Sequence, residues 1–469
     1  MNQLLEKDER IYELYENDEN ISHDLKIFIL ILMNKLWENP KLVALIIENT
    51  DIKILREHLA QFFVHNFYEN IFSFDCIEDN LLYVLTLLMQ SEIKNLNDIN
   101  QADKFLVDTP CGIMFEEIYN KFEIQICLDK ITKKAIDNLE NNFSNHQISY
   151  DIKTIVEELK KNNILTNETN DGINKIEDFK EKFLINFDVL YLTKFIEENK
   201  NNNKDLTDFL KTKLSILSKS KQKFSNKKLL SILYEYKNAD KLIYLYRHNF
   251  YIAIDFIEQI FKDILNKIHS LPSSIKKLCR IISELINQKF QNIDTINKHL
   301  YIAKFFFGKL IIPFLSNKTF FYNLNENSFH NLNNICYILK KYISFDLFTS
   351  DDSEFNLTPF NLYIIHNIEN IVNLFQNITK IKLPLFIEKL INNKLPIEYE
   401  YDYFNENPDK NAYMQSILYN INQVKALITT FNNNKQILLY DNKNKNIKKI
   451  IDKLMLENNL NLLNKMIDK

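Results

Sequence analysis

The chain has 469 residues, a net charge of −4 and a hydrophobic content of 46%. This content is enough for packed cores and excludes a largely disordered chain, and the length allows about three domains. The nearly balanced charge gives no overall basic field, so nucleic acid is not an expected partner. The five cysteines are widely spaced and form no CxxC pair, which favours buried thiols in a reducing compartment over a zinc or dithiol site.

No stretch of the sequence predicts a membrane span or a secretory signal. The longest apolar run, residues 27–33, is far shorter than the ~20 residues that cross a bilayer. The N-terminal segment is acidic and lacks the cationic start and apolar core of a signal peptide. We therefore expect a cytoplasmic protein.

Helical periodicity runs through almost the whole chain, and three glycines with eight prolines argue against a β-rich fold. The predicted helices, in chain order, cover residues 24–48, 51–73, 78–96, 111–142, 150–162, 174–198, 205–217, 226–268, 275–285, 293–314, 326–348, 360–393, 411–430 and 445–467. Short polar or proline-containing breaks separate them, as in a helical bundle. The predicted fold class is all-α.

The sequence lacks the motifs of the glycine-rich phosphate loops and of several catalytic and metal sites. The three glycines, Gly112, Gly172 and Gly308, are too far apart to build a glycine-rich phosphate loop. The sequence contains no HExxH, no GxSxG and no zinc-deaminase signature, and no two histidines have the spacing of metal ligands. We expect no cofactor and no metal.

Two neighbouring segments carry a family resemblance. "SLPSSIKKLCRIISELINQKF" (270–290) followed by "YIAKFFFGKLIIPFLSN" (301–317) resembles the central signature of Ras GTPase-activating (Ras-GAP) domains, where an "LP" helix precedes a helix ending in "FLRF..PA". Phe307, Gly308 and Lys309 fall on the family's Phe-Leu-Arg. Pro313 falls on its proline, where we expect the helix to stop, because proline lacks an N–H and clashes with the preceding turn. Phe314 stands where the family has alanine, and the later proline is missing.

The resemblance extends to the endocytic proteins that join a Ras-GAP domain to a Rab-exchange domain. The segments at 34–48, 80–95, 105–122 and 383–391 look like that subfamily's helices in the same order. This divides the chain into an acidic helical extension (1–27), a Ras-GAP-like helical domain (28–395) and a C-terminal helical extension (396–469), with nothing resembling the exchange domain. The resemblance implies a small GTPase in its GTP form as partner, and a role in endocytosis or vesicle traffic, with peripheral membrane attachment or endocytic scaffold partners left open.

In an active Ras-GAP a loop presents an arginine to the transferred phosphoryl group, which is worth ~10³–10⁵ in rate. Here the loop position falls on "LVDTP" (106–110), and Val107 or Asp108 occupies the arginine's place. Lys104 is the nearest cation, and Lys309 keeps a charge at the Phe-Leu-Arg motif without the forked guanidinium that supports the loop. IQ-motif scaffold proteins, whose GAP-related domain also lacks the arginine, bind GTP-loaded Rho-type GTPases without speeding hydrolysis.

The leading interpretation is a small-GTPase-binding regulator or scaffold with a degenerate arginine finger and no catalytic residue of its own. The residues predicted to contact the GTPase are Lys104, Asp108, Thr109, Lys276, Arg280, Phe307 and Lys309. Two alternatives stay open: an active GTPase activator that uses a non-standard catalytic group, and a helical scaffold without GTPase binding. The cationic cluster at 276–280 also fits an ordinary solvated face.

Gly308 interrupts an apolar run in a chain that has few glycines. A missing side chain inside a packed helix permits close backbone approach, at about 1 kcal/mol of helix propensity. In the functional interpretation, a neighbouring helix or the finger loop approaches Gly308 and takes part in GTPase recognition. In the structural interpretation, a helix crosses tightly at Gly308 and has no functional role. Lys309 could equally be a lysine whose apolar stem lies along the core while its charge reaches solvent.

Overall fold

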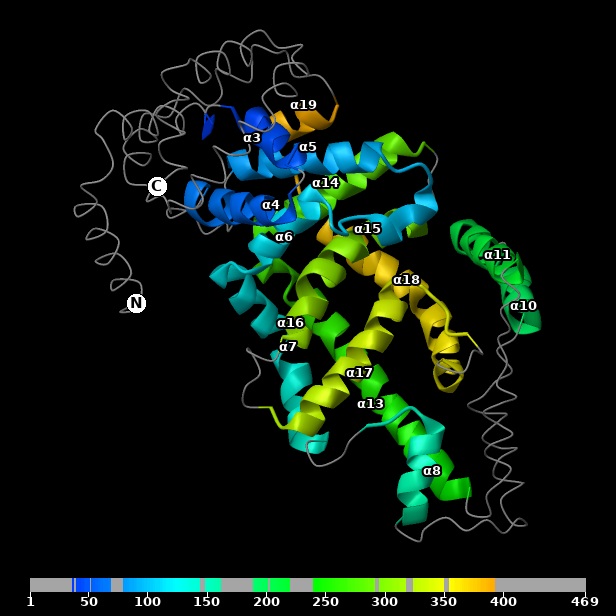
Figure 1. The fold of residues 1–469 in the computed structure, drawn as a ribbon. Coiled ribbons are helices and arrows are strands. Elements are labelled where there is room, and N and C mark those ends of the chain that lie inside the picture. Colours follow the sequence, from blue (N-terminus) through cyan, green and yellow to red (C-terminus); the bar gives the residue numbers. More distant parts are fainter. Residues whose placement is uncertain are drawn as a thin grey trace, which may run out of the picture.

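The computed structural model describes residues 36–37, 39–50, 52–68, 79–143, 148–161, 189–200, 203–219, 239–291, 295–317, 324–349 and 354–392. All regular structure in these ranges is helical, which confirms the predicted all-α class (Figure 1). The extensions at 1–27 and 396–469, and the helices predicted at 411–430 and 445–467, lie outside the described residues.

The first half of the described chain contains α3 (Pro40–Glu48), α4 (Lys53–Gln61), α5 (Asp79–Lys94), α6 (Pro110–Tyr119), α7 (Phe122–Phe143), α8 (Ile152–Lys161), α10 (Val189–Asn199) and α11 (Lys204–Lys219). The second half contains α13 (Ala239–Asn266), α14 (Ser273–Lys289), α15 (Thr295–Phe305), α16 (Ile312–Ser316), α17 (Glu326–Ile343), α18 (Phe360–Ile378) and α19 (Leu385–Ile391). Shorter turns are the π-helical η1 (Phe62–Phe67) and η4 (Phe306–Ile311), and the 3₁₀ turns η2 (Ile99–Lys104), η3 (Ile268–Ser270) and η5 (Phe355–Leu357).

One apolar helix, Thr295–Ser316, runs through the middle of the bundle as α15, η4 and α16. It contacts α6, α11, α14, α17 and α18, and α5 packs on the outer side of α14. Within the described residues it is long and apolar enough to cross a membrane, but 61% of its most apolar window is buried inside the protein. Burial of that kind is typical of a core helix. In Figure 1 α8 and the start of α13 lie far from α6.

Pro313 does not end this helix, so the expected stop is wrong. The helix continues to Ser316, and Pro313 follows directly after the π turn η4, whose last bond runs from the Ile312 N–H to the Phe307 carbonyl. A proline ring normally clashes with the carbonyl four residues earlier, here that of Lys309. The wider π turn opens the helix at this point, so the proline is accommodated.

Two predicted helices are each divided in the structure. Residues 111–142 form α6 and α7, which separate at Asn120 because α6 packs on α4 and α5 whereas α7 packs on α13. Residues 360–393 form α18 and α19, with an extended link that ends at Pro384. Periodicity alone does not reveal these breaks, since apolar residues continue across them.

Glu354 ties the chain after α17 to the body of that helix. Its carboxylate accepts from the Tyr337 hydroxyl at 2.7 Å, from Lys341 at 2.9 Å and from the Thr349 N–H at 3.0 Å. Burial alone would raise the pKa of Glu354, but these bonds outweigh it and lower the pKa from 4.5 to about 2. A depressed folded-state pKa means that the bonds add stability above pH 4.5 and lose it as the pH falls toward 2.

We predict that Glu354→Gln lowers the free energy of unfolding at pH 7 by about 1–3 kcal/mol, because it removes charge-assisted bonds. The difference between wild type and variant should shrink between pH 4.5 and 2.5, as urea unfolding followed by circular dichroism would measure. Glu197→Gln, at an exposed position on α10, is the matched control and should change stability by less than ~0.5 kcal/mol. A difference that stays constant down to pH 2.5 would contradict this account.

Candidate functional site

The segment between η2 and α6, residues 105–109, has a strained backbone, and we call it the presentation loop. Leu106 and Asp108 both have positive φ, 62° and 52°. A residue other than glycine in this conformation costs on the order of 1–3 kcal/mol and persists only where its surroundings hold it. For leucine, which has no side chain to bond locally, the conformation is particularly unusual.

Glu92, near the end of α5, holds the presentation loop through both carboxylate oxygens. Oε1 accepts from the Leu106 N–H at 2.5 Å, and Oε2 accepts from the Thr109 hydroxyl at 2.9 Å. Thr109 is the N-cap of α6, and its Oγ1 accepts from the Gly112 N–H at 3.0 Å. The carboxylate therefore fixes both the loop and the first turn of the helix that follows.

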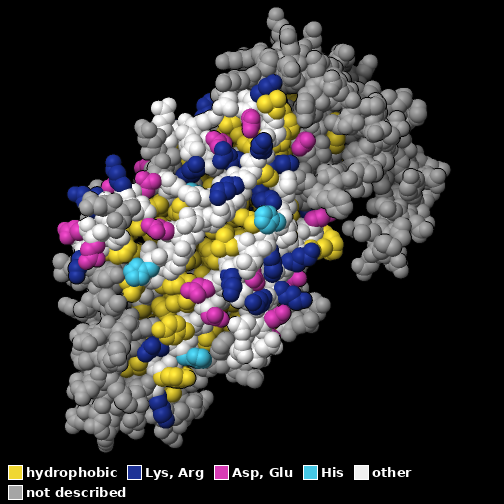
Figure 2. Space-filling view, turned by 180° about the vertical axis from the view of Figure 1, so that it is seen from behind, with side chains coloured by type: hydrophobic (Ala, Val, Ile, Leu, Met, Phe, Trp, Pro, Cys, Tyr) yellow, Lys and Arg dark blue, Asp and Glu magenta, His cyan; other side chains and the backbone are white. Residues whose placement is uncertain are grey.

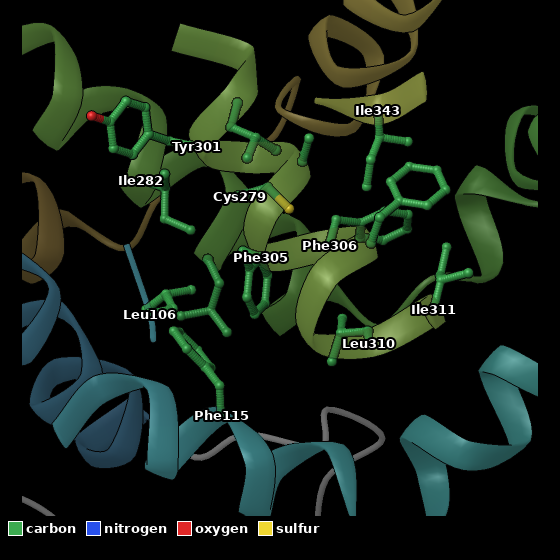
Figure 3. Packing of buried hydrophobic residues seen from close by; sticks show 14 of the residues in the cluster. Leu106, Phe115, Cys279, Ile282, Tyr301, Phe305, Phe306, Leu310, Ile311 and Ile343 are labelled. Atoms are coloured by element: carbon green, nitrogen blue, oxygen red, sulfur yellow. The ribbon is translucent and has the colours of Figure 1, made fainter. Parts of the chain in front are cut away.

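The side chain of Leu106 anchors the loop in the core. It is fully buried and points toward Phe115 of α6 and Phe305 of α15, whose ring centroids are 4.6 Å apart (Figure 3). The preceding Phe105 packs edge-on against Tyr301, with 5.4 Å between the centroids. Burial of these side chains offsets part of the backbone strain.

Gly112 is the glycine that a close backbone approach requires. A methyl group in place of its hydrogen would lie 2.3 Å from the carbonyl oxygen of Leu106, so only glycine lets the loop fold back over α6. Gly308 is different, since a methyl group there would meet only the Lys304 Cδ, at 3.9 Å. Both explanations of Gly308 by close approach, functional or structural, are therefore wrong; Gly308 lies within the π turn η4.

The outer side of the presentation loop faces solvent. The Val107 residue is 51% exposed and the Asp108 side chain 82% exposed. The Asp108 carboxylate lies 3.7 Å from the Lys53 ammonium at the start of α4, where Ile52 and Ile54 are also exposed. The ion pair contributes little stability at such exposure. Exposed apolar and charged side chains therefore occur together at the start of α4.

The two π turns flank α6 and each brings a basic group to it. Lys309 of η4 donates to Glu116 at 2.7 Å, and its side chain is only 16% exposed. The His65 ring nitrogen of η1 lies 3.1 Å from the next residue, Glu117. Lys309 also acts on Glu92: burial raises the pKa of that carboxyl, and the Leu106 N–H, the Thr109 hydroxyl and the Lys309 charge oppose the rise.

The structure brings together some of the predicted contact residues and separates others. Asp108 and Thr109 directly precede α6, Lys309 pairs with Glu116 in the second half of α6, and the exposed Lys104 ends the turn that leads into the loop. Phe307 is fully buried, with its ring 5.2 Å from that of Phe261, so it cannot touch a partner.

The other two predicted contact residues lie on α14 and have local bonds. Lys276 donates to the Ile268 carbonyl at 3.4 Å, and Arg280 pairs with Glu284 at 2.6 Å. These bonds fit the alternative of a solvated helix face.

The described part of this region offers neither a group of metal ligands nor a reactive thiol. Among the described residues no group of His, Cys, Asp and Glu could hold a metal ion. Cys111, beside Glu92, is fully buried, and burial raises its pKa far above neutral pH, so the thiol is no nucleophile. Seen from behind, the protein has a face on which basic, acidic and apolar side chains are interspersed (Figure 2).

Sequence reasoning missed Glu92, Gly112 and Lys53. No local pattern distinguishes Glu92 from the other acids of the chain, because its role depends on a loop 14 residues away. Gly112 did carry a signal: it is one of only three glycines, and it directly follows a Thr-Pro-Cys helix start.

The two glycines make a matched pair for testing the loop. We predict that Gly112→Ala destabilises the protein by about 1–3 kcal/mol, since the new methyl group collides with backbone. Gly308→Ala should be neutral or stabilise by up to ~1 kcal/mol, because the new methyl group meets only the Lys304 Cδ, at ordinary van der Waals distance, and alanine favours the helix. Thermal unfolding of both variants measures the contrast, and equal effects would contradict it.

Comparison of the chain with models of known protein families gives no match, and comparison with curated proteins gives none either. What the protein does has therefore to be inferred from the presentation loop, its supports and the exposed residues around it.

Proposed function

We propose that this protein is a Ras-GAP-like regulator or scaffold that binds a small GTPase in its GTP form, in endocytosis or vesicle traffic, without arginine-finger catalysis. The observation that carries the proposal is the meeting of two distant segments at α6. Lys309 and Glu116, 193 residues apart in sequence, form an ion pair 2.7 Å long on the helix that follows the presentation loop. The role in traffic comes from the family resemblance.

The contacts of this region support the proposal because they match what the resemblance implies. In the family, the Phe-Leu-Arg motif supports the finger loop from below, and here Lys309 occupies the motif's last position. Lys309 pairs with α6 and acts electrostatically on Glu92, the residue that holds the loop. A strained, exposed loop on a rigid helical body is also the usual form of a binding element.

The same contacts argue against conventional catalysis. Stabilising a transferred phosphoryl group requires a cation that reaches into the GTPase's nucleotide site. The outward positions of the loop are an aliphatic residue, Val107, and an acid, Asp108. Lys53 pairs with that acid, and Lys309 is largely enclosed. A negative charge near phosphates opposes the reaction, so the loop serves recognition.

The test is to capture Ras, Rho and Rab proteins, loaded with GTP or GDP, on the immobilised full-length chain, with single-turnover hydrolysis measured beside it. We expect at least one GTPase to be captured selectively in its GTP form, with unchanged hydrolysis. Acceleration of ~10³ or more would favour the alternative of an active GTPase activator. Capture that ignores the nucleotide, or no capture, would favour a helical scaffold without this function.

A gain of function offers a sharper prediction. Val107→Arg places a guanidinium at the outward position between the two left-handed residues. For the GTPase that is captured, we expect hydrolysis to accelerate at least ~10-fold, short of the ~10³–10⁵ of an evolved finger.

Two variants control for charge and for position. Val107→Lys adds the same charge without the forked donor and should give less acceleration. Tyr244→Arg, at an exposed position toward the α8 end of α13, should give none. If Val107→Arg and Tyr244→Arg behave alike, the presentation loop does not face the nucleotide.

A further inference from the structure

We infer that Glu92 is the positioning residue of the presentation loop: its carboxylate holds the loop so that Val107 and Asp108 face a partner protein. The identity of that partner, a small GTPase, rests on the proposed function. The effect of Glu92 on the loop does not, and it can be measured without any partner.

The geometry of the carboxylate carries the inference. Its two oxygens engage the loop on both sides of Val107, at the Leu106 N–H (2.5 Å) and the Thr109 hydroxyl (2.9 Å). Asp108 lies between these two bonds. Both Leu106 and Asp108, two positions apart, have left-handed backbone conformations. A conformation of this kind needs external bonds to persist, and Glu92 supplies two of them from a different helix.

Burial disfavours the charge of the carboxylate at this place. Glu92 is largely enclosed, and burial raises the pKa of its carboxyl. Folding therefore disfavours the ionised carboxylate, which is the form that predominates in an unfolded chain at neutral pH. The facing groups are the Lys309 ammonium from η4 and the protonated Cys111 thiol from α6. The bonds from the Leu106 N–H and the Thr109 hydroxyl offset part of the cost of burying the charge.

Positioning and stability can be separated with Glu92→Gln and Glu92→Ala. Glutamine keeps an acceptor for the Leu106 N–H but turns an N–H₂ toward Thr109, so the loop is held partly. Alanine removes both acceptors. Because the charge is lost, Glu92→Gln should unfold at the same temperature as wild type or a higher one at pH 7.

Glu354→Gln is the matched control. Glu354 also accepts from a backbone N–H and a threonine hydroxyl, both on Thr349, but it holds another loop. This control should lower the unfolding temperature and leave the presentation loop unchanged, which is the reverse of the effect expected at Glu92.

The first measurement is the mobility of a nitroxide label at position 107, by electron paramagnetic resonance on the full-length chain carrying Val107→Cys. The described cysteines, Cys111, Cys127, Cys279 and Cys336, are buried, and Cys76→Ser removes the fifth. We expect the label to move about threefold faster with Glu92→Ala, because the loop loses the bonds that order it. The increase should be smaller with Glu92→Gln. Unchanged mobility in both variants would overturn the inference.

The second measurement is capture of the GTP-loaded GTPase by the unlabelled variants. Capture should fall about tenfold with Glu92→Ala and partly recover with Glu92→Gln, because a loop that must be ordered on binding loses affinity. Equal capture by Glu92→Ala and wild type would overturn the role of Glu92 in binding while leaving the proposed function intact. If wild type captures no GTPase but Glu92→Ala makes the label more mobile, the proposed function fails. The role of Glu92 in positioning the loop then stands.

Discussion

The fold depends on covering one helix that is apolar around most of its circumference. In the helix Thr295–Ser316, the consecutive residues Phe305, Phe306 and Phe307 are all buried, so their side chains spread around much of its circumference. Such a helix is stable in water only when other helices surround it. α6, α11, α14, α17 and α18 supply that cover, and α6 and α11 come from distant parts of the sequence. The bundle is the arrangement that buries this helix.

The presentation loop takes its shape from the same helix. Leu106 and Phe105 insert their side chains against Phe305 and Tyr301, and the backbone between them has to turn sharply to do so. The resulting backbone strain appears at two left-handed residues, Leu106 and Asp108. The bonds of Glu92 to the loop, and the absence of a side chain at Gly112, make the turn possible. What faces outward at Val107 and Asp108 is therefore fixed by packing several residues away. This links the core to a surface suited for recognition.

The helical class and most helix positions could be predicted from the sequence, because apolar residues recur with helical period along the whole chain. Helix breaks were harder: the division at Asn120 has no glycine or proline and reflects which partner each half packs against. The region around α6 was predicted from a resemblance, and the structure places Asp108 and Thr109 just before this helix and Lys309 against Glu116 in its second half. The prediction of partner contacts is less reliable for single residues: Phe307 is buried, and Lys276 and Arg280 bond to nearby groups. The role of Glu92 could not be predicted from the sequence. Its carboxylate accepts from a backbone N–H 14 residues away, and no periodic pattern marks such a bond.

The π turns η1 and η4 have a consequence for comparing this chain with others. A π turn contains one residue more than the α turn it replaces, so each adds a single residue inside an otherwise regular helix. A chain with the same fold but without these turns would be one residue shorter at each place. Position-by-position matching would then pair every later residue of the helix with the wrong neighbour, unless a gap is placed in the middle of the helix. Relatives of this protein are therefore better sought by allowing one-residue gaps at Phe62–Phe67 and Phe306–Ile311 than by matching these helices without interruption.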